Sequence, residues 1–129
     1  MLAGVTAGLA GCVSGIVDDA SFPEADVIVA PEDELVFDPA ELSVSAGETV
    51  RWGFANAGHN VSCRPKDADE VALPDGAEPF ASYSPGDDPD VTLVQGGETY
   101  EHTFEVPGEY TYVCIPHADS GMVGTIRVE

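Results

Sequence analysis

The chain has 129 residues, enough for one modest hydrophobic core, and 43% of them are hydrophobic, as in a globular domain rather than a disordered tail. Acidic residues number 24 against four basic ones, and the resulting charge of −20 excludes nucleic-acid binding, which requires clusters of lysine and arginine. The acids are spread from Asp18 to Glu129, so we interpret them mainly as a hydrated surface of the halophilic type, in which salt screens their mutual repulsion, rather than as a dedicated partner patch.

The first segment, residues 1–11, is uncharged and apolar and leads directly into Cys12. It is too short to span a bilayer, which takes roughly 20 residues, and it is similar to the end of a secretory signal peptide. Leu9-Ala10-Gly11-Cys12 looks like a lipobox, in which the cysteine receives a lipid and becomes the new N-terminus. We therefore expect a signal-peptide remnant over 1–11, lipidation of Cys12 and an acidic tether over 12–24. An ordinary apolar leader with a chance cysteine is the alternative.

From residue 25 onward, short apolar runs alternate with turn residues, a pattern typical of β-strands. Residues 64–90 interrupt the pattern with a proline-rich stretch, which predicts a long excursion containing at most a short helical turn. Strands are expected at 42–44, 50–54, 59–63, 91–94, 99–104, 109–114 and 123–128, and two further short apolar runs stand at 27–29 and 35–37. Short strands at this spacing predict an all-β fold, a β-sandwich of seven or eight strands that occupies residues 25–129.

The residues that point to chemistry lie near the end of the chain, where Cys114, His117 and Met122 form Cys-x2-His-x4-Met between two expected strands. His59 stands far upstream, at the head of another strand. One thiolate and two imidazoles in a trigonal set, with a weak thioether on the axis, define a blue-copper centre. The pattern therefore predicts one copper ion, Cu(I) or Cu(II), held by His59, Cys114, His117 and Met122.

With these residues the chain resembles the cupredoxins of the plastocyanin type, and most closely the halocyanins, the membrane-anchored blue-copper proteins of extreme halophiles. The resemblance covers roughly 25–129 and implies a Greek-key sandwich that transfers single electrons between membrane-bound donor and acceptor complexes in transient encounters. It implies a monomer on the outer face of the cytoplasmic membrane, anchored through Cys12. It also implies that Asn60, outside the ligand set, ties the His59 strand to the Cys114 loop.

The electron port is the one place where the chain departs from this family. Plastocyanins of photosynthetic membranes carry a tyrosine directly before the copper cysteine, which provides a second electron route, whereas this chain has Val113 there. The resemblance therefore leaves the edge of His117 as the expected port. An uncharged collar should surround it, formed by Ala57, Gly58, Pro116, Ala118 and Gly121.

Other functions fit the sequence less well. Copper oxidases and nitrite reductases need further histidines, and only His102, for which we expect a structural role, is left outside the copper site, so the chain is not expected to be an enzyme. A copper-storage or delivery protein of the cell exterior is the alternative, although its methionine-rich donors are missing, since Met1 and Met122 are the only methionines. Cys63 should point inward as a small apolar residue.

Overall fold

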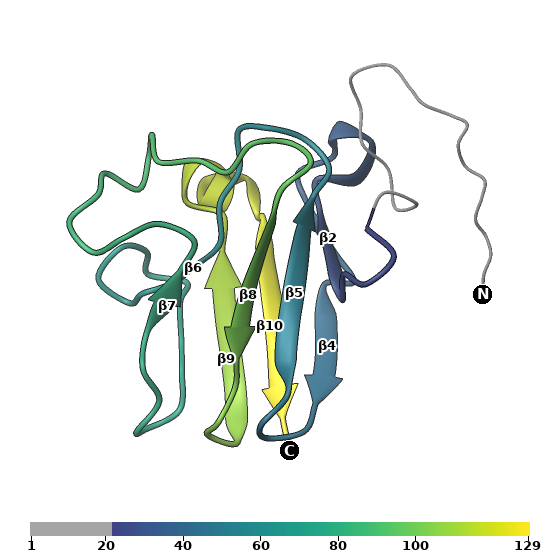
Figure 1. Ribbon diagram of the computed structural model, residues 1–129. Coiled ribbons are helices and arrows are strands. Elements are labelled where there is room, and N and C mark those ends of the chain that lie inside the picture. Colours follow the sequence, from purple (N-terminus) through teal and green to yellow (C-terminus); the bar gives the residue numbers. More distant parts are fainter. Residues whose placement is uncertain (1–21) are drawn as a thin grey trace.

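The computed structural model describes residues 22–129, which form a sandwich of two sheets (Figure 1). One sheet has the strand order β4 (Glu41–Val44), β10 (Val123–Val128), β9 (Gly108–Val113), β6 (Ser62–Cys63) and β7 (Phe80–Ala81). The other has the order β3 (Phe37–Asp38), β2 (Val27–Val29), β5 (Thr49–Phe54) and β8 (Thr99–Thr103). The 3-10 turns η3 (Pro31–Asp33) and η4 (Ile115–Ser120) complete the described elements. The expected signal-peptide remnant and Cys12 lie outside the described residues.

Both sheets are mixed, because β4 pairs with β10 and β2 pairs with β5 in the parallel sense while the other pairs are antiparallel. The chain repeatedly changes sheet, passing from β4 to β5, from β5 to β6 and from β7 to β8. Connections of this kind are those of a Greek-key sandwich, so the predicted fold class is confirmed.

The core lies between the two sheets and follows the alternation of the strands. Along β5, Val50, Trp52 and Phe54 are fully buried and face inward. Tyr112 on β9 meets them from the opposite sheet, its ring centroid 5.4 Å from that of Trp52 at an interplanar angle of 86°. Each fully buried aliphatic or phenylalanine side chain in such a core contributes about 1.5–3 kcal/mol relative to exposure. The inner faces of β5 and β9 therefore hold the two sheets together.

Two expected elements differ from the observed ones. The strand expected over 91–94 is a turn, because the amides of Val91 and Thr92 both donate to the carbonyl of Asp88, and only Val94 bridges to His59. Conversely, the proline-rich excursion contains β7, a two-residue strand that pairs with β6. The local pattern missed β7 because a strand this short has no measurable periodicity of its own.

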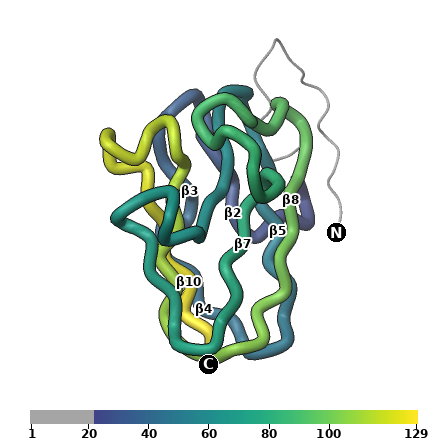
Figure 2. Tube along the Cα trace, turned by 90° about the vertical axis from the view of Figure 1, so that its left-hand side faces the viewer, coloured from purple at the N-terminus to yellow at the C-terminus, as the bar shows by residue number. Residues whose placement is uncertain are grey.

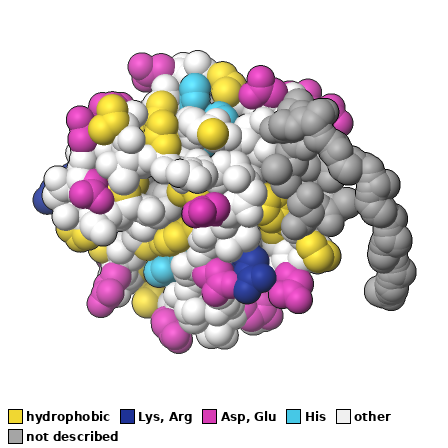
Figure 3. Space-filling view, turned by 45° about the horizontal axis from the view of Figure 1, so that its top comes forward, with side chains coloured by type: hydrophobic (Ala, Val, Ile, Leu, Met, Phe, Trp, Pro, Cys, Tyr) yellow, Lys and Arg dark blue, Asp and Glu magenta, His cyan; other side chains and the backbone are white. Residues whose placement is uncertain are grey.

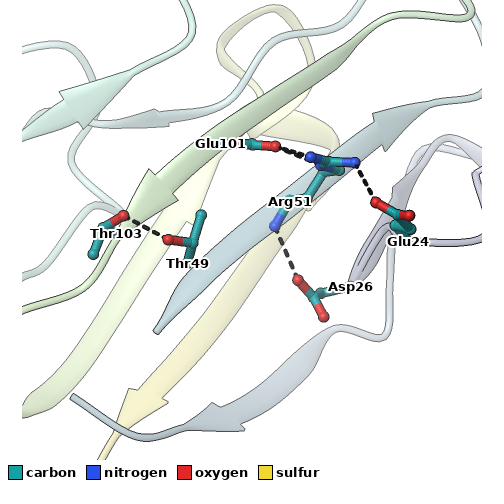
Figure 4. A network of polar contacts seen from close by, with 6 residues as sticks. All are labelled: Glu24, Asp26, Thr49, Arg51, Glu101 and Thr103. Carbon is teal, nitrogen blue, oxygen red and sulfur yellow. Dashed lines mark hydrogen bonds and ion pairs between the residues drawn. The ribbon is translucent and has the colours of Figure 1, made fainter. Parts of the chain in front are cut away.

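The segment that leads into the sandwich is held against the outer face of the four-stranded sheet. Phe22 is buried over Gly53, where a β-carbon would lie 2.5 Å from the phenyl ring. Arg51 bridges the carboxylates of Glu24 and Glu101 (Figure 4). Residues 22–24, the last part of the expected tether, therefore pack against the sandwich. The part over 12–21 lies outside the described residues. Within residues 22–129, no helix has the length and apolar character needed to cross a membrane.

The loops that carry the predicted site gather at one end of the sandwich (Figures 1 and 2). The connection that follows β5, the turn η3 and the turn η4 all lie there, whereas Glu129 lies at the other end. Strand ends held by a rigid sandwich are suited to fixing side chains from distant parts of the sequence around one point.

Candidate metal centre

His59 and the Cys114 loop reach the same point from different strands. His59 follows β5, and its carbonyl accepts a hydrogen bond of 2.9 Å from Val94 N–H. Cys114 lies between β9 and η4, directly after Val113, and His117 lies in η4. One donor atom from each of His59, Cys114 and His117 falls within a cluster in which all three lie within 4.8 Å of one another. The sandwich therefore brings together three of the four predicted ligands.

The geometry inside this cluster suits a small cation. The Sγ of Cys114 lies 3.7 Å from Nδ1 of His59, and the two imidazole centroids are 4.8 Å apart. Cys114 and His59 are buried, whereas His117 is half-buried. One ring of the cluster therefore reaches the surface.

Met122 is brought to the same loop by backbone hydrogen bonds. Cys114 N–H donates to the carbonyl of Met122 over 3.1 Å, and Met122 N–H donates to the carbonyl of His117 over 3.3 Å. The return of the chain requires a left-handed residue, and Gly121, with φ of 89°, provides it at no steric cost. The Met122 side chain is fully buried, so its thioether belongs to the interior beneath the loop rather than to solvent.

Asn60 links the two halves of the site. Its Oδ1 accepts a 2.9 Å hydrogen bond from Ile115 N–H, directly after Cys114. Its Nδ2 donates to the carbonyls of Pro89 (2.8 Å) and Thr92 (3.2 Å). The backbone N–H of Asn60 donates to Cys114 Sγ over 3.4 Å, a contact that side-chain patterns in the sequence do not reveal. One fully buried residue thus joins the His59 segment, the Cys114 loop and the loop after β7.

The pKa values of His59 and Cys114 are both shifted by burial. Burial lowers the pKa of His59, and the neighbouring His117 lowers it further while Asp33 opposes the shift, so the neutral imidazole that binds metals is the stable form. Burial raises the pKa of the Cys114 thiol, although the Asn60 and His117 amides act in the opposite direction. A bound cation reverses that balance, because a coordinating thiol is deprotonated. One thiolate, two imidazoles and a buried thioether nearby fit copper, for which soft sulfur donors are selective.

The remaining histidine and cysteine of the described chain stand apart from the cluster. His102 stacks on Phe80 with ring centroids 3.9 Å apart and an interplanar angle of 15°, across the open side between β8 and β7. Cys63 is fully buried in the core, where its thiol donates to the carbonyl of Thr111 over 3.4 Å and burial raises its pKa to about 12. Both contacts agree with the structural positions predicted for these residues.

The surface around His117 is uncharged at its centre. Two histidine side chains adjoin one another on this end of the molecule, with hydrophobic side chains beside them and acidic ones farther out (Figure 3). The five expected collar residues are all exposed or half-buried: Ala57, Gly58, Pro116, Ala118 and Gly121. Val91, in the loop after β7, is also exposed, at 70%.

Comparison with known proteins agrees with this fold and this cluster, which define a small copper-binding β-sandwich. Residues 24–129 match the family of copper binding proteins described as the plastocyanin/azurin family, and the chain belongs to that family. It is 39% identical over 97 residues to the plastocyanin of Scenedesmus fuscus, and the matched region covers 74% of this chain and 88% of that protein. It is 42% identical over 96 residues to the chloroplastic plastocyanin of Hordeum vulgare, covering 73% of this chain but only 55% of that longer protein. Among solved structures, a mutant plastocyanin of fern superposes with a TM-score of 0.58 at 27% identity, covering 80% of this chain and 98% of that one. Membership of this family places the chain among electron carriers and not among enzymes.

Proposed function

We propose that this chain carries single electrons by means of one copper ion held by His59, Cys114, His117 and Met122. The observation that supports it most directly is the cluster of one thiol and two imidazoles within 4.8 Å, closed by a loop that buries a methionine. When bound, copper supplies the one-electron couple. The buried thioether favours the reduced ion and so raises the reduction potential.

The protein's part in this function is to keep the donors in one geometry through the change of charge. His59 is held by its backbone bridge to Val94, and Asn60 holds the Cys114 loop through the Ile115 amide. Hydrogen bonds from outside the ligand set orient ligands and tune the metal. Because these contacts tie the His59 segment and the Cys114 loop to other parts of the sandwich, the donors have little room to rearrange.

The test is the colour of the protein after addition of Cu(II). The wild-type protein should turn intensely blue from charge transfer between the Cys114 thiolate and copper, and Cys114→Ser should remain colourless. Cys63→Ala is the matched control, since it removes the other described thiol without touching the cluster, and it should stay blue. A blue Cys114→Ser variant would disprove the ligand assignment. A wild type that binds only Cu(I) and stays colourless would favour copper storage or delivery.

The half-buried edge of His117 is the port through which we expect electrons to enter and leave. An uncharged collar lets a partner approach with little desolvation, and electron-transfer encounters are typically small and transient. Ala118→Glu should slow electron exchange with a redox partner, while Ser45→Glu, which places the same charge at the opposite end of the sandwich, should not. Equal rates for the two variants in stopped-flow measurements would exclude this port.

The location and partners follow from the halocyanin-like features of the sequence. We propose that a lipid on Cys12 holds the protein at the outer face of the cytoplasmic membrane, where it serves membrane-bound donor and acceptor complexes as a monomer in high salt. A single lipid chain binds membranes only marginally, whereas two chains give stable attachment. Cys12→Ser should therefore move the protein from the membrane fraction to the soluble fraction with its colour unchanged. A wild type found equally in the soluble fraction would rule out the anchor.

A further inference from the structure

A second polar cluster, which the metal centre does not use, surrounds Tyr83 in the loop after β7. The side chain is 6% exposed, and its hydroxyl lies 2.7 Å from Ser62 Oγ and 2.5 Å from Asp67 Oδ2. The Arg64 guanidinium lies over the ring at 5.1 Å from its centroid and also donates to the carbonyl of Tyr83 over 3.3 Å. The ring is therefore fixed from both ends, between the sheet and a half-buried arginine at the surface.

Two short connections lead from the Cys114 sulfur to this cluster, and both meet at Ser62. In the first, Asn60 N–H donates to Cys114 Sγ, and Ser62 follows two residues later. In the second, Val113, which is bonded to Cys114, is the direct register partner of Ser62 between β9 and β6. From Ser62 the hydroxyl bond continues to Tyr83. Electronic coupling falls less steeply through covalent and hydrogen bonds than across empty gaps.

The Tyr83 hydroxyl reaches the outer face of the five-stranded sheet, the face onto which Val113 points. Tyr112 points into the core, so Val113 points to the outer face, and its register partner Ser62 shares that face. The Ser62 hydroxyl meets Tyr83 there. Ser62 thus links Tyr83 to Val113, the residue that precedes Cys114.

We propose that Tyr83 provides a second electron exit, which couples the Cys114 sulfur to the side of the five-stranded sheet at Arg64. The exit rests on the copper function proposed above. Burial and the Asp67 carboxylate raise the pKa of Tyr83 to about 12, so the phenol keeps its proton at neutral pH. Tyr83 thus couples the Cys114 sulfur to the surface at Arg64 without gaining or losing a proton. Electrons can then leave by the side of the sandwich as well as by the His117 end.

The experiment measures electron transfer inside one molecule, so that docking does not affect the rate. A thiol-reactive ruthenium polypyridyl complex is attached to Ser84→Cys, an exposed position next to Tyr83, in copper-loaded protein that also carries Cys12→Ser. Flash-quench oxidation produces ruthenium(III), which takes one electron from Cu(I) and yields ruthenium(II) and Cu(II), with no bond made or broken. Tyr83→Phe, which removes the hydroxyl link, and Ser62→Ala, which removes its partner, should each lower this rate constant severalfold.

Tyr110→Phe is the matched control, because Tyr110 is also buried and its hydroxyl donates to the carbonyl of Val106 over 2.6 Å, away from the proposed connection. Its rate should equal that of the parent protein. A rate unchanged by Tyr83→Phe and Ser62→Ala, or lowered equally by Tyr110→Phe, would overturn the proposal. If the parent protein does not turn blue with Cu(II), the proposed copper function itself is wrong. If the parent is blue but its electron-transfer rate does not depend on Tyr83, only the second exit is wrong.

The hydrogen-bonded link can be checked separately in the metal-free protein by NMR titration of the labelled Tyr83 phenol. Asp67 raises the pKa of Tyr83 and the Ser62 hydrogen bond lowers it. Asp67→Asn should therefore bring this pKa down toward its ordinary value, and Ser62→Ala added to the Asp67→Asn variant should raise it again. A Tyr83 pKa that ignores Ser62→Ala would show that the link is absent, and the exit would be rejected without any kinetic measurement.

Discussion

Replacing Asn60 by alanine tests how firmly the two halves of the metal centre are joined. The side chain is fully buried and makes hydrogen bonds to Ile115 N–H and to the carbonyls of Pro89 and Thr92. At about 1 kcal/mol of net stability for each, the three bonds together contribute about 3 kcal/mol. Three part-buried backbone groups would also lose their partner, which adds to this loss.

The assay is denaturant unfolding of the metal-free protein, in which copper binding cannot mask the loss. Asn56→Ala is the control. Asn56 lies in the same connection after β5, is half-buried, and makes one side-chain hydrogen bond, of 2.8 Å, to the carbonyl of Ala30. Its removal should lower the free energy of unfolding by only about 1 kcal/mol. If the two variants lose the same stability, the Asn60 bonds do not hold the site together and this reasoning is wrong.

Four further outcomes are expected. Met122→Gln replaces a soft donor by a harder one that favours Cu(II), so voltammetry should show a lower reduction potential with copper still bound; an unchanged potential would place Met122 away from the metal. Gly124→Ala would set a β-carbon 2.4 Å from Cζ of Tyr112, and such overpacking should lower the unfolding free energy by about 1–3 kcal/mol, whereas wild-type stability would show that the ring moves freely. Burial lowers the pKa of His102 below its unfolded value, so the stability that it contributes in the metal-free protein is complete above about pH 6.5 and is lost as the pH falls. His102→Phe should therefore lose less stability than the wild type between pH 7 and pH 5, and parallel curves would contradict this. Dilution from high to low salt should lower the melting temperature markedly, because the charge of −20 is then unscreened, and a melting temperature independent of salt would assign the acids another role.

The sequence by itself determined the features that depend on neighbours along the chain. Alternation along residues 50–54 places Val50, Trp52 and Phe54 on one face, because the side chains of a strand point to opposite sides in turn, and all three are buried. The short spacing of Cys114, His117 and Met122 predicted one loop between two strands, and the backbone bonds of that loop are present. Such features follow from local geometry, so a single sequence is sufficient to predict them.

Only the tertiary structure decided the features that join distant segments. His59 lies 55 residues from Cys114 in the chain, and the two donor atoms meet because β6, which begins soon after His59, pairs with β9, which ends just before Cys114. Val91 lies in a turn closed on the Asp88 carbonyl, not in a strand, and it is exposed. Tyr83 is joined to β9 through Ser62, again by contacts between segments that are distant in the sequence. Periodicity says which side of a strand a residue faces, but it contains no information on which other segment comes to lie against that side; that choice is made by the packing of the whole sandwich.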